Sequence, residues 1–308
     1  MQKPKFDPGL TERYTGRLRR AINKDGTFNV RRMGTSWRDS HPYLQLVSMP
    51  WPAFWLTLVT GYVGVNTLFA LVYYSLGPGQ VGGTEDPSKL GRFMTDFFFS
   101  AHTLTTVGYG SLYPRGVGAN LVALLEAMVG LLAFAVATGL LFGRVSRPSA
   151  RFAFSERMVM APFGNGSSLQ FRVANRRANT LMELEARMML MTVVDDGGQL
   201  RRNYDLLKLE RERVLFLPLT WTVVHPIDPD SPLFNRTAAD LEQAQAEILI
   251  LVKAWDETFS QTVHARYSYT HEEIVWGRRF AHAFRIDESG DMVVQVDRVG
   301  ELVAMGQG

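Results

Sequence analysis

The chain has 308 residues, 46% of them hydrophobic, which is enough for one large domain or two modest ones with a sizeable core. Its formal net charge of +3 comes mostly from the segments beside two long apolar stretches, so it indicates attraction to a membrane surface and argues against nucleic-acid binding. Because the chain contains no cysteine, disulfide bonds and thiolate chemistry are excluded.

The first fifty residues precede any long apolar run. Residues 1–36 mix Gly, Pro, Asn and basic residues with little periodicity, and they predict an irregular arm on the cytoplasmic side. For residues 37–50 we predict a helix that lies in the membrane interface, with Pro42 at its start and Asp39 or Ser40 as its cap. The alternative for this segment is an ordinary loop that leads into the apolar run.

Two apolar segments are long enough to cross a membrane. Trp51–Leu76 has no charged residue, and Asn120–Gly143 has only Glu126. At about 1.5 Å per residue, each crosses a hydrocarbon core about 30 Å thick. Basic residues before the first span and after the second predict that both termini are cytoplasmic, with 77–115 as the outside loop. We therefore predict a two-span domain over residues 51–148, in the cell membrane.

The outside loop contains a third apolar segment. Residues 77–91 are rich in Gly, Pro and charge and predict an exposed turret, whereas Arg92–Leu104 predicts a re-entrant half-helix that is too short to span. Irregular chain after such a helix is stable at membrane depth only where it is buried in protein or lines a water-filled path. The next segment is Gly-rich and comprises Thr106, Val107, Gly108, Tyr109 and Gly110.

This Gly-rich segment predicts a potassium selectivity filter. K⁺ sheds its hydration water only where carbonyl oxygens replace it, and glycines 108 and 110 allow the backbone angles that point successive carbonyls at one axis. We predict K⁺, the permeant ion, at Thr106, Val107, Gly108 and Tyr109. One chain supplies one wall of such a ring, so four copies are needed and the prediction is a homotetramer.

The second span carries the candidate cavity and gate residues. Glu126 is costly inside a membrane: it either holds the half-helix by hydrogen bonds, the alternative we favour, or faces the ion path and attracts cations. Gly130 and Gly139 either let the helix bend or let a neighbour pack closely. Phe142, near the inner end, is a candidate for an apolar constriction that gates by dewetting.

Residues 149–308 carry short runs separated by turn signals, which is typical of β structure. We predict an antiparallel, immunoglobulin-like cytoplasmic sandwich, with Asp196–Gly198 as a hairpin turn and a short helix or loop within Thr237–Ala246. Met188, Met189 and Met191 are interpreted as core filling. The predicted strands are Met158–Met160, Ser168–Ala174, Glu183–Val194, Gln199–Leu207, Leu217–His225, Ala246–Ala254, Thr262–Tyr269 and Met292–Asp297.

Other classes of protein fit the sequence less well. A membrane-anchored receptor or adaptor, whose β domain binds a partner, leaves the Gly-rich segment and the half-helix unexplained. No pair of histidines has metal-ligand spacing and no phosphate-binding loop is present, so we do not expect an enzyme. His225 and His264 are interpreted as structural residues, with a role in proton sensing as the alternative.

Several sequence blocks outside the filter segment match those of a known family. They comprise Trp51 at the start of the first span, Arg147-Pro148, Phe154-Ser155, and the runs Trp221–Asp228, Ala265–Tyr269 and Glu273–Gly277. In these blocks the sequence resembles the prokaryotic branch of the inward rectifier potassium channels. The resemblance implies a slide helix, a pore helix and a cytoplasmic domain that extends the pore, with a second constriction near Thr258–Thr262. It also implies gating by the inner helix and the cytoplasmic domain, and it suggests the broad class of voltage-gated channels.

The resemblance also implies roles for single residues. It places Phe142 at the helix-bundle crossing and Phe134 where strongly rectifying relatives carry an acidic residue, so strong rectification is not expected. His102 and Leu112 replace the glutamate and arginine that brace the filter in many relatives, so the bracing must differ. The implied partners are membrane lipids with anionic, phosphoinositide-like headgroups, because guanidinium groups bind phosphate bidentately. The candidate lipid-binding residues are Trp51, Arg144, Arg147 and Arg151.

Overall fold

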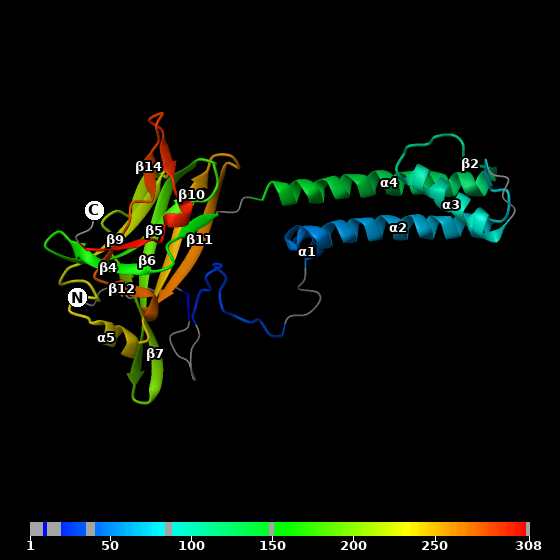
Figure 1. Cartoon of the computed structure of the whole chain (residues 1–308). Helices are drawn as coiled ribbons and strands as arrows, with labels where there is room; N and C mark the ends of the chain where they lie inside the picture. The colour runs from blue at the N-terminus through cyan, green and yellow to red at the C-terminus, as the bar shows by residue number, and fades with distance from the viewer. Residues whose placement is uncertain (1–8, 11–19, 35–40, 84–87, 148–150, 306–308) are drawn as a thin grey trace. The chain divides into compact units, whose positions relative to one another are not determined.

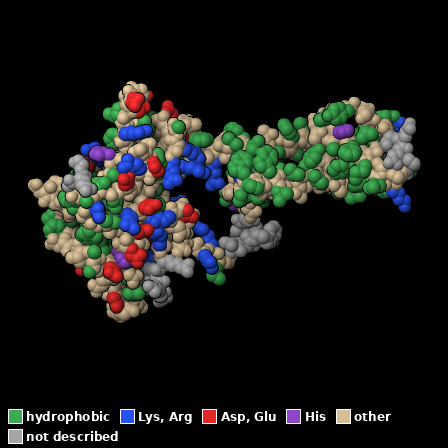
Figure 2. Space-filling model, in the orientation of Figure 1, with side chains coloured by type: hydrophobic (Ala, Val, Ile, Leu, Met, Phe, Trp, Pro, Cys, Tyr) green, Lys and Arg blue, Asp and Glu red, His purple; other side chains and the backbone are tan. Residues whose placement is uncertain are grey.

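The computed structural model describes residues 9–10, 20–34, 41–83, 88–147 and 151–305. The chain divides into two compact units: one contains the described residues up to Arg32 and those from Arg151 onward, and the other runs from Met33 to Arg147. The first unit is rich in strands and the second consists of helices (Figure 1). Hydrophobic side chains cover the visible face of the helical unit, whereas charged side chains are spread over the β-rich unit (Figure 2).

The described residues of the helical unit contain four helices: α1 (Pro42–Ser48), α2 (Trp51–Leu76), α3 (Lys89–Leu104) and α4 (Gly116–Val145). Within the described residues, α2 and α4 are the helices long and apolar enough to cross a membrane, which agrees with the two predicted spans. The half-helix α3 begins before the predicted Arg92, because the Ser88 side chain caps it and accepts a hydrogen bond from the Gly91 N–H at 2.9 Å. Helix α1 begins at Pro42 as predicted, while Asp39 and Ser40 lie outside the described residues.

The outside loop is more ordered than the sequence predicts. Two short strands, β1 (Val81–Gly82) and β2 (Tyr113–Pro114), pair in antiparallel fashion and join the start of the loop to its end. Val81 and Gly82 are buried, so the prediction of an exposed turret over 77–91 is wrong at these two residues. The reason is a partner distant in sequence, which the local composition does not reveal.

Two five-stranded sheets form the β-rich unit. One has the order β11-β10-β6-β7, with β8 also paired to β6, and the other has the order β12-β4-β5-β3, with β9 also paired to β5. The strands are β3 (Phe152–Phe154), β4 (Met158–Phe163), β5 (Gly166–Asn175), β6 (Leu181–Asp196), β7 (Gln199–Leu207), β8 (Arg213–Phe216), β9 (Thr220–Ile227), β10 (Glu247–Asp256), β11 (Gln261–Thr270), β12 (Ile274–Trp276), β13 (Arg278–Phe280), β14 (Phe284–Ile286), β15 (Met292–Val294) and β16 (Leu302–Ala304). The pairs β13-β16 and β14-β15 form two further small sheets.

The two large sheets enclose one hydrophobic core. Strand β10 alternates, with Ile248, Ile250 and Val252 in this core and Leu249 in a smaller cluster on the other face. Strand β5 contributes Phe171 to the same core from the second sheet. The unit is therefore a sandwich, as predicted, but it is not wholly antiparallel, because β12 pairs with β4 in parallel.

The predicted strands are all present; Gln199–Leu207 has the predicted bounds, and the others differ at one or both ends. Strand β9 begins at Thr220 rather than Leu217, because Pro218 lacks the N–H that a ladder position donates. The hairpin between β6 and β7 turns at Gly197 and Gly198, both with positive φ, as predicted. The helix within Thr237–Ala246 is α5 (Ala238–Gln243), capped by Thr237. Methionines 188 and 191 are buried in two hydrophobic clusters, which confirms core filling there.

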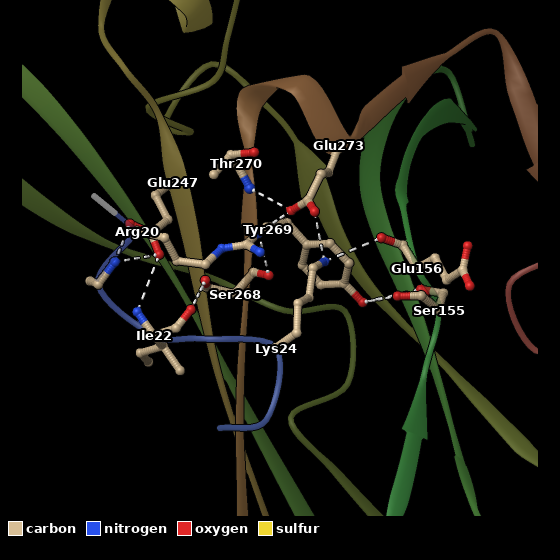
Figure 3. Close-up of polar contacts among 11 residues, drawn as sticks. Arg20, Ile22, Lys24, Ser155, Glu156, Glu247, Ser268, Tyr269, Thr270 and Glu273 are labelled. Carbon is tan, nitrogen blue, oxygen red and sulfur yellow. Dashed lines mark hydrogen bonds and ion pairs between the residues drawn. The ribbon is translucent and has the colours of Figure 1, made fainter. Parts of the chain in front are cut away.

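A described part of the N-terminal arm packs on the β-rich unit (Figure 3). The Ala21 N–H donates to both carboxylate oxygens of Glu247, at 3.0 and 2.9 Å. The Ser268 hydroxyl donates to the Ile22 carbonyl at 2.7 Å, and the Arg20 guanidinium donates to the Ser268 carbonyl at 3.1 Å. The two contacts of Ser268 occupy polar groups of the edge strand β11 that would otherwise be open to another chain.

Lys24 strengthens this attachment. Its ammonium lies 2.9 Å from the Glu273 carboxylate, which also pairs with Arg20. The same ammonium lies 4.5 and 4.7 Å from the ring centroids of Tyr267 and Tyr269. Burial lowers the pKa of Lys24, while the Glu273 carboxylate opposes that shift. The arm is thus attached by ion pairs, by hydrogen bonds to its backbone and by cation–π contacts, all between residues far apart in sequence.

Candidate functional site

The Gly-rich segment follows α3 directly and has an alternating backbone. Thr106, Gly108 and Gly110 have φ values of +58°, +55° and +81°, whereas Val107 and Tyr109 do not have positive φ. An alternation of positive and negative φ is compatible with a backbone whose successive carbonyls face one side. The glycines adopt this conformation freely, but a β-branched residue at positive φ is strained by about 1–3 kcal/mol. The sequence indicated the two glycines and gave no sign of the conformation of Thr106.

The inner end of this segment is tied to the end of α3. The His102 carbonyl accepts hydrogen bonds from the N–H groups of Val107 at 3.0 Å and Gly108 at 3.2 Å. The His102 ring meets the ring of Tyr109 edge-on, with centroids 5.0 Å apart. His102 therefore holds the segment through its backbone and through its ring, whereas Leu112 packs in an apolar cluster with Tyr73, beyond the other end.

Glu126 joins three helices of the helical unit. Its carboxylate is fully buried and accepts hydrogen bonds from the Tyr73 hydroxyl of α2 at 2.7 Å and from the Ser100 hydroxyl of α3. The Ser100 hydroxyl also lies 3.1 Å from the Asn66 side-chain oxygen. Of the two roles considered for Glu126, the structure shows the hydrogen bonds to the half-helix. An acidic group buried this deeply requires such partners.

The two glycines of α4 differ in their surroundings. A Cβ atom at Gly130 would lie 2.1 Å from the carbonyl oxygen of Leu104, the last residue of α3, whereas a Cβ at Gly139 would meet nothing within 4 Å. At Gly130 the observed role is therefore close packing against the half-helix. Whether Gly139 is a hinge stays a prediction.

One side of the site is open in the single chain. Tyr109 is 74% exposed, and Phe134 and Phe142 on α4 are 73% and 72% exposed. A cavity of about 610 Å³ between α2, the end of α3 and α4 is lined mainly by apolar residues and includes Thr106, Gly130 and Phe134. The gate role of Phe142 and the effect of Phe134 on rectification stay predictions.

Comparison with known proteins decides the family. Residues 152–306 match the family model of the inward rectifier potassium channel C-terminal domain, and residues 61–147 match the ion channel model. The chain is similar to the inward rectifier potassium channel Kirbac3.1 of Paramagnetospirillum magnetotacticum, with 37% identity over 92% of this chain and 95% of that protein. The chain belongs to the inward rectifier potassium channel family.

More distant relatives are also inward rectifier potassium channels. The human G protein-activated inward rectifier potassium channels 3 and 2 are 28% and 26% identical, over 92% and 90% of this chain and 78% and 70% of their own lengths. The solved structure of the sporulation control protein Spo0M from Bacillus subtilis is 12% identical, and the match covers 46% of this chain and 59% of the Spo0M chain. Its TM-score of 0.25 is too low to indicate a shared fold. The resemblance inferred from sequence is confirmed, and the protein is a potassium channel of the cell membrane rather than an enzyme.

The broad class of voltage-gated channels is the wrong class for this inward rectifier. A voltage sensor is an Arg-rich spanning helix. Helix α2 has no charged residue, and α4 has only Glu126 and Arg144. In the described part of the channel α2 and α4 are the two candidate spans. Because neither helix is rich in arginine, neither is a voltage sensor.

The Arg144 side chain of the channel makes its described contacts within the helical unit. Its guanidinium donates to the carbonyls of Leu46 at 2.8 Å, Val47 at 3.1 Å and Met49 at 2.5 Å, which are free groups at the end of α1. It also lies 4.5 Å from the Trp51 ring centroid. Arg144 therefore attaches α1 to the inner end of α4, a role that the sequence did not reveal.

The other basic residues proposed for lipid contact are more accessible. The exposed Arg147 guanidinium has a single described hydrogen bond, to the Ser48 hydroxyl at 3.2 Å. Arg151 is exposed at the start of the β-rich unit. The guanidinium groups of both residues are placed to donate hydrogen bonds to a phosphate. Arg147 and Arg151 are therefore stronger candidates for lipid contact than Arg144.

His225 of the channel is a buried structural residue. Its Nδ1 lies 2.6 Å from the Lys208 carbonyl and its Nε2 lies 2.8 Å from the Ser231 hydroxyl. A neutral ring satisfies both contacts, since Nδ1–H donates to the carbonyl and Nε2 accepts from the hydroxyl. Burial lowers the pKa of His225, which also favours the neutral form. These contacts favour the structural interpretation over proton sensing, whereas His264 is exposed.

Proposed function

We propose that this channel selects potassium at the backbone carbonyls of Thr106, Val107, Gly108 and Tyr109, with Gly110 completing the filter. The observation that carries the proposal is the alternation of positive and non-positive φ along these residues, an alternation that allows successive carbonyls to face one side. Carbonyl rings of this kind replace the hydration shell of K⁺. The segment also starts at the C-terminal end of α3, where the helix dipole is negative and favours a cation.

The same proposal requires a homotetramer. One chain supplies one wall of a carbonyl ring, so three further copies must close it. The exposure of Tyr109 and Phe134 in the single chain supports this, because other subunits would cover them. The membership of the chain in the inward rectifier family supports it as well.

The filter is tested by replacing Gly110 with alanine. Alanine resists φ near +81°, so Gly110→Ala should turn the last carbonyls away from the axis and lower the ratio of K⁺ to Na⁺ flux at least tenfold. The measurement is ion flux into liposomes that contain the purified channel, with Ba²⁺ as the blocker.

A matched control separates the filter from general backbone strain. Gly79 has φ +79°, and a Cβ atom there would meet no atom within 4 Å, as is also true of Gly110, but it lies in the loop after α2. Gly79→Ala should therefore keep the flux ratio within about twofold. Both variants should retain the native mass of four 34.7 kDa chains. Equal K⁺ and Na⁺ flux in the unaltered channel, or an unchanged ratio in Gly110→Ala, contradicts the proposal.

The proposal extends to membrane lipids, since Arg147, two residues after α4, and Arg151, at the start of the β-rich unit, both carry exposed charge. A basic residue near an anionic membrane surface contributes about 1 kcal/mol, or about fivefold in affinity. Arg147→Gln should therefore shift the concentration of inositol phospholipid that changes K⁺ flux about fivefold upward. Arg236→Gln, which removes an exposed charge elsewhere in the β-rich unit, is the control. An identical lipid response of the Arg147 variant and the unaltered channel removes Arg147 from the site.

A further inference from the structure

The backbone of the filter segment has little support of its own within one chain. A Cβ atom at Gly108 or at Gly110 would meet no atom within 4 Å. The inner end of the segment is tied to the His102 carbonyl. Its outer end, from Gly110 to Ser111, continues into the part of the outside loop that contains β2.

The outer end is held by the turret. Strand β1 of the turret pairs with β2, which begins two residues after Ser111, in the register Val81↔Pro114 and Gly82↔Tyr113. The chain before the half-helix is thereby bonded to the chain after the filter. A hydrogen bond from the Arg115 N–H to the Gln80 carbonyl, at 2.7 Å, continues this pairing by one step.

At Gly83 the two segments lie so close together that no side chain fits between them. A Cβ atom at Gly83 would lie 1.8 Å from the Ser111 carbonyl oxygen and 2.9 Å from its carbonyl carbon, and the residue has φ +101°. Both the space and the backbone conformation therefore exclude any side chain. Ser111 directly follows Gly110, so Gly83 lies against the Ser111–Leu112 peptide, one peptide beyond the end of the filter.

The pairing is anchored to the helices and covered from outside. Val81 and Leu112 belong to one apolar cluster with Tyr73 of α2 and Phe99 of α3. On the outer side the Arg115 guanidinium donates to the Tyr113 hydroxyl at 2.7 Å and lies over that ring. The chain after the filter is therefore fixed to the same helices that carry the half-helix, by hydrogen bonds and packing instead of an ion pair.

We propose that the turret segment Gln80–Gly83 is a positioning element of the selectivity filter, which sets the outermost carbonyls through the contact of Gly83 with Ser111. This inference rests on the proposed function of residues 106–110. Carbonyl oxygens replace the hydration shell of the ion only where they point at it, so we expect a displaced Ser111 to lower selectivity before it lowers conduction. Gly83 and its neighbours act through the filter backbone and do not touch the ion.

The test is Gly83→Ala, with Gly79→Ala as the control for strain at positive φ. In planar bilayers, reversal potentials give the permeability ratio of K⁺ to Na⁺. We expect this ratio to fall about fivefold or more in Gly83→Ala while K⁺ current persists, and to stay within twofold in Gly79→Ala. A ratio within twofold of the unaltered channel in an assembled Gly83→Ala tetramer overturns the inference.

A second variant covers the case in which Gly83→Ala does not assemble. Arg115 is exposed, so Arg115→Gln removes the contact with the Tyr113 hydroxyl without disturbing the buried cluster. Its permeability ratio should fall about threefold, and an unchanged ratio also overturns the inference. Gly110→Ala separates the two proposals: if it keeps selectivity the filter assignment fails, whereas if it loses selectivity and the turret variants do not, only the turret inference fails.

Discussion

Replacing Gly130 with alanine should reduce potassium flux on the order of a hundredfold. The new Cβ would lie 2.1 Å from the Leu104 carbonyl oxygen, whereas real Cβ atoms stay at least 3.0 Å from their neighbours, so the end of α3 must move by about 1 Å. The filter begins two residues later, at Thr106. Displacements of about 1 Å in sites that depend on exact geometry cost on the order of 10²-fold in rate.

Gly64→Ala is the matched control for this prediction. Gly64 lies within the spanning helix α2, and alanine favours a helix over glycine by about 1 kcal/mol at both positions. Because nothing lies within 4 Å of a Cβ at Gly64, this variant should keep flux within about twofold. K⁺ flux in liposomes measures both variants. Normal flux in Gly130→Ala would show that close packing against Leu104 does not position the filter.

The two spans could be predicted from sequence because their signal is local. Trp51–Leu76 lacks charge from end to end, and helix α2 has these same bounds. The turn at Gly197 and Gly198 was predicted for the same reason, since two adjacent glycines are a strong turn signal. Each of these features is determined by residues that are consecutive in the sequence.

Features that depend on distant partners were missed. Strands β1 and β2 have two residues each, and the pairing of Val81 with Pro114 joins segments on either side of the half-helix. The attachment of the arm through Glu273 to Arg20 joins residues 253 positions apart. Neither element has a periodic pattern, so tertiary contacts alone define them.

The candidate site was predicted in part. Gly108 and Gly110 were expected to have unusual backbone angles, which the structure has, whereas Thr106 shares the conformation against its own preference. Arg144 was interpreted as a lipid ligand from its charge and position. Its hydrogen bonds to the end of α1 depend on how two helices pack, which charge and position in the sequence do not specify.

Replacing Glu126 with leucine should destabilise the channel by about 3 kcal/mol. The Tyr73 hydroxyl then loses its acceptor inside the buried region, and Ser100 keeps only its contact with Asn66. A buried polar group without a partner costs about 1–3 kcal/mol. The measurement is thermal loss of the native tetramer of the purified channel in detergent. Glu126→Gln retains an oxygen acceptor and should lose less than half as much.

A double variant shows whether the hydrogen bond itself is responsible. Tyr73→Phe removes the donor that Glu126→Leu leaves unsatisfied, so both changes together replace a polar pair by apolar groups of similar shape. Such pairs of changes cost less than the sum of the single ones. The double variant should therefore be more stable than Glu126→Leu alone by about 1 kcal/mol. If its loss equals the sum of the two single losses, then Glu126 acts through its volume or charge, and the connection from α2 to α4 does not depend on the Tyr73 hydrogen bond.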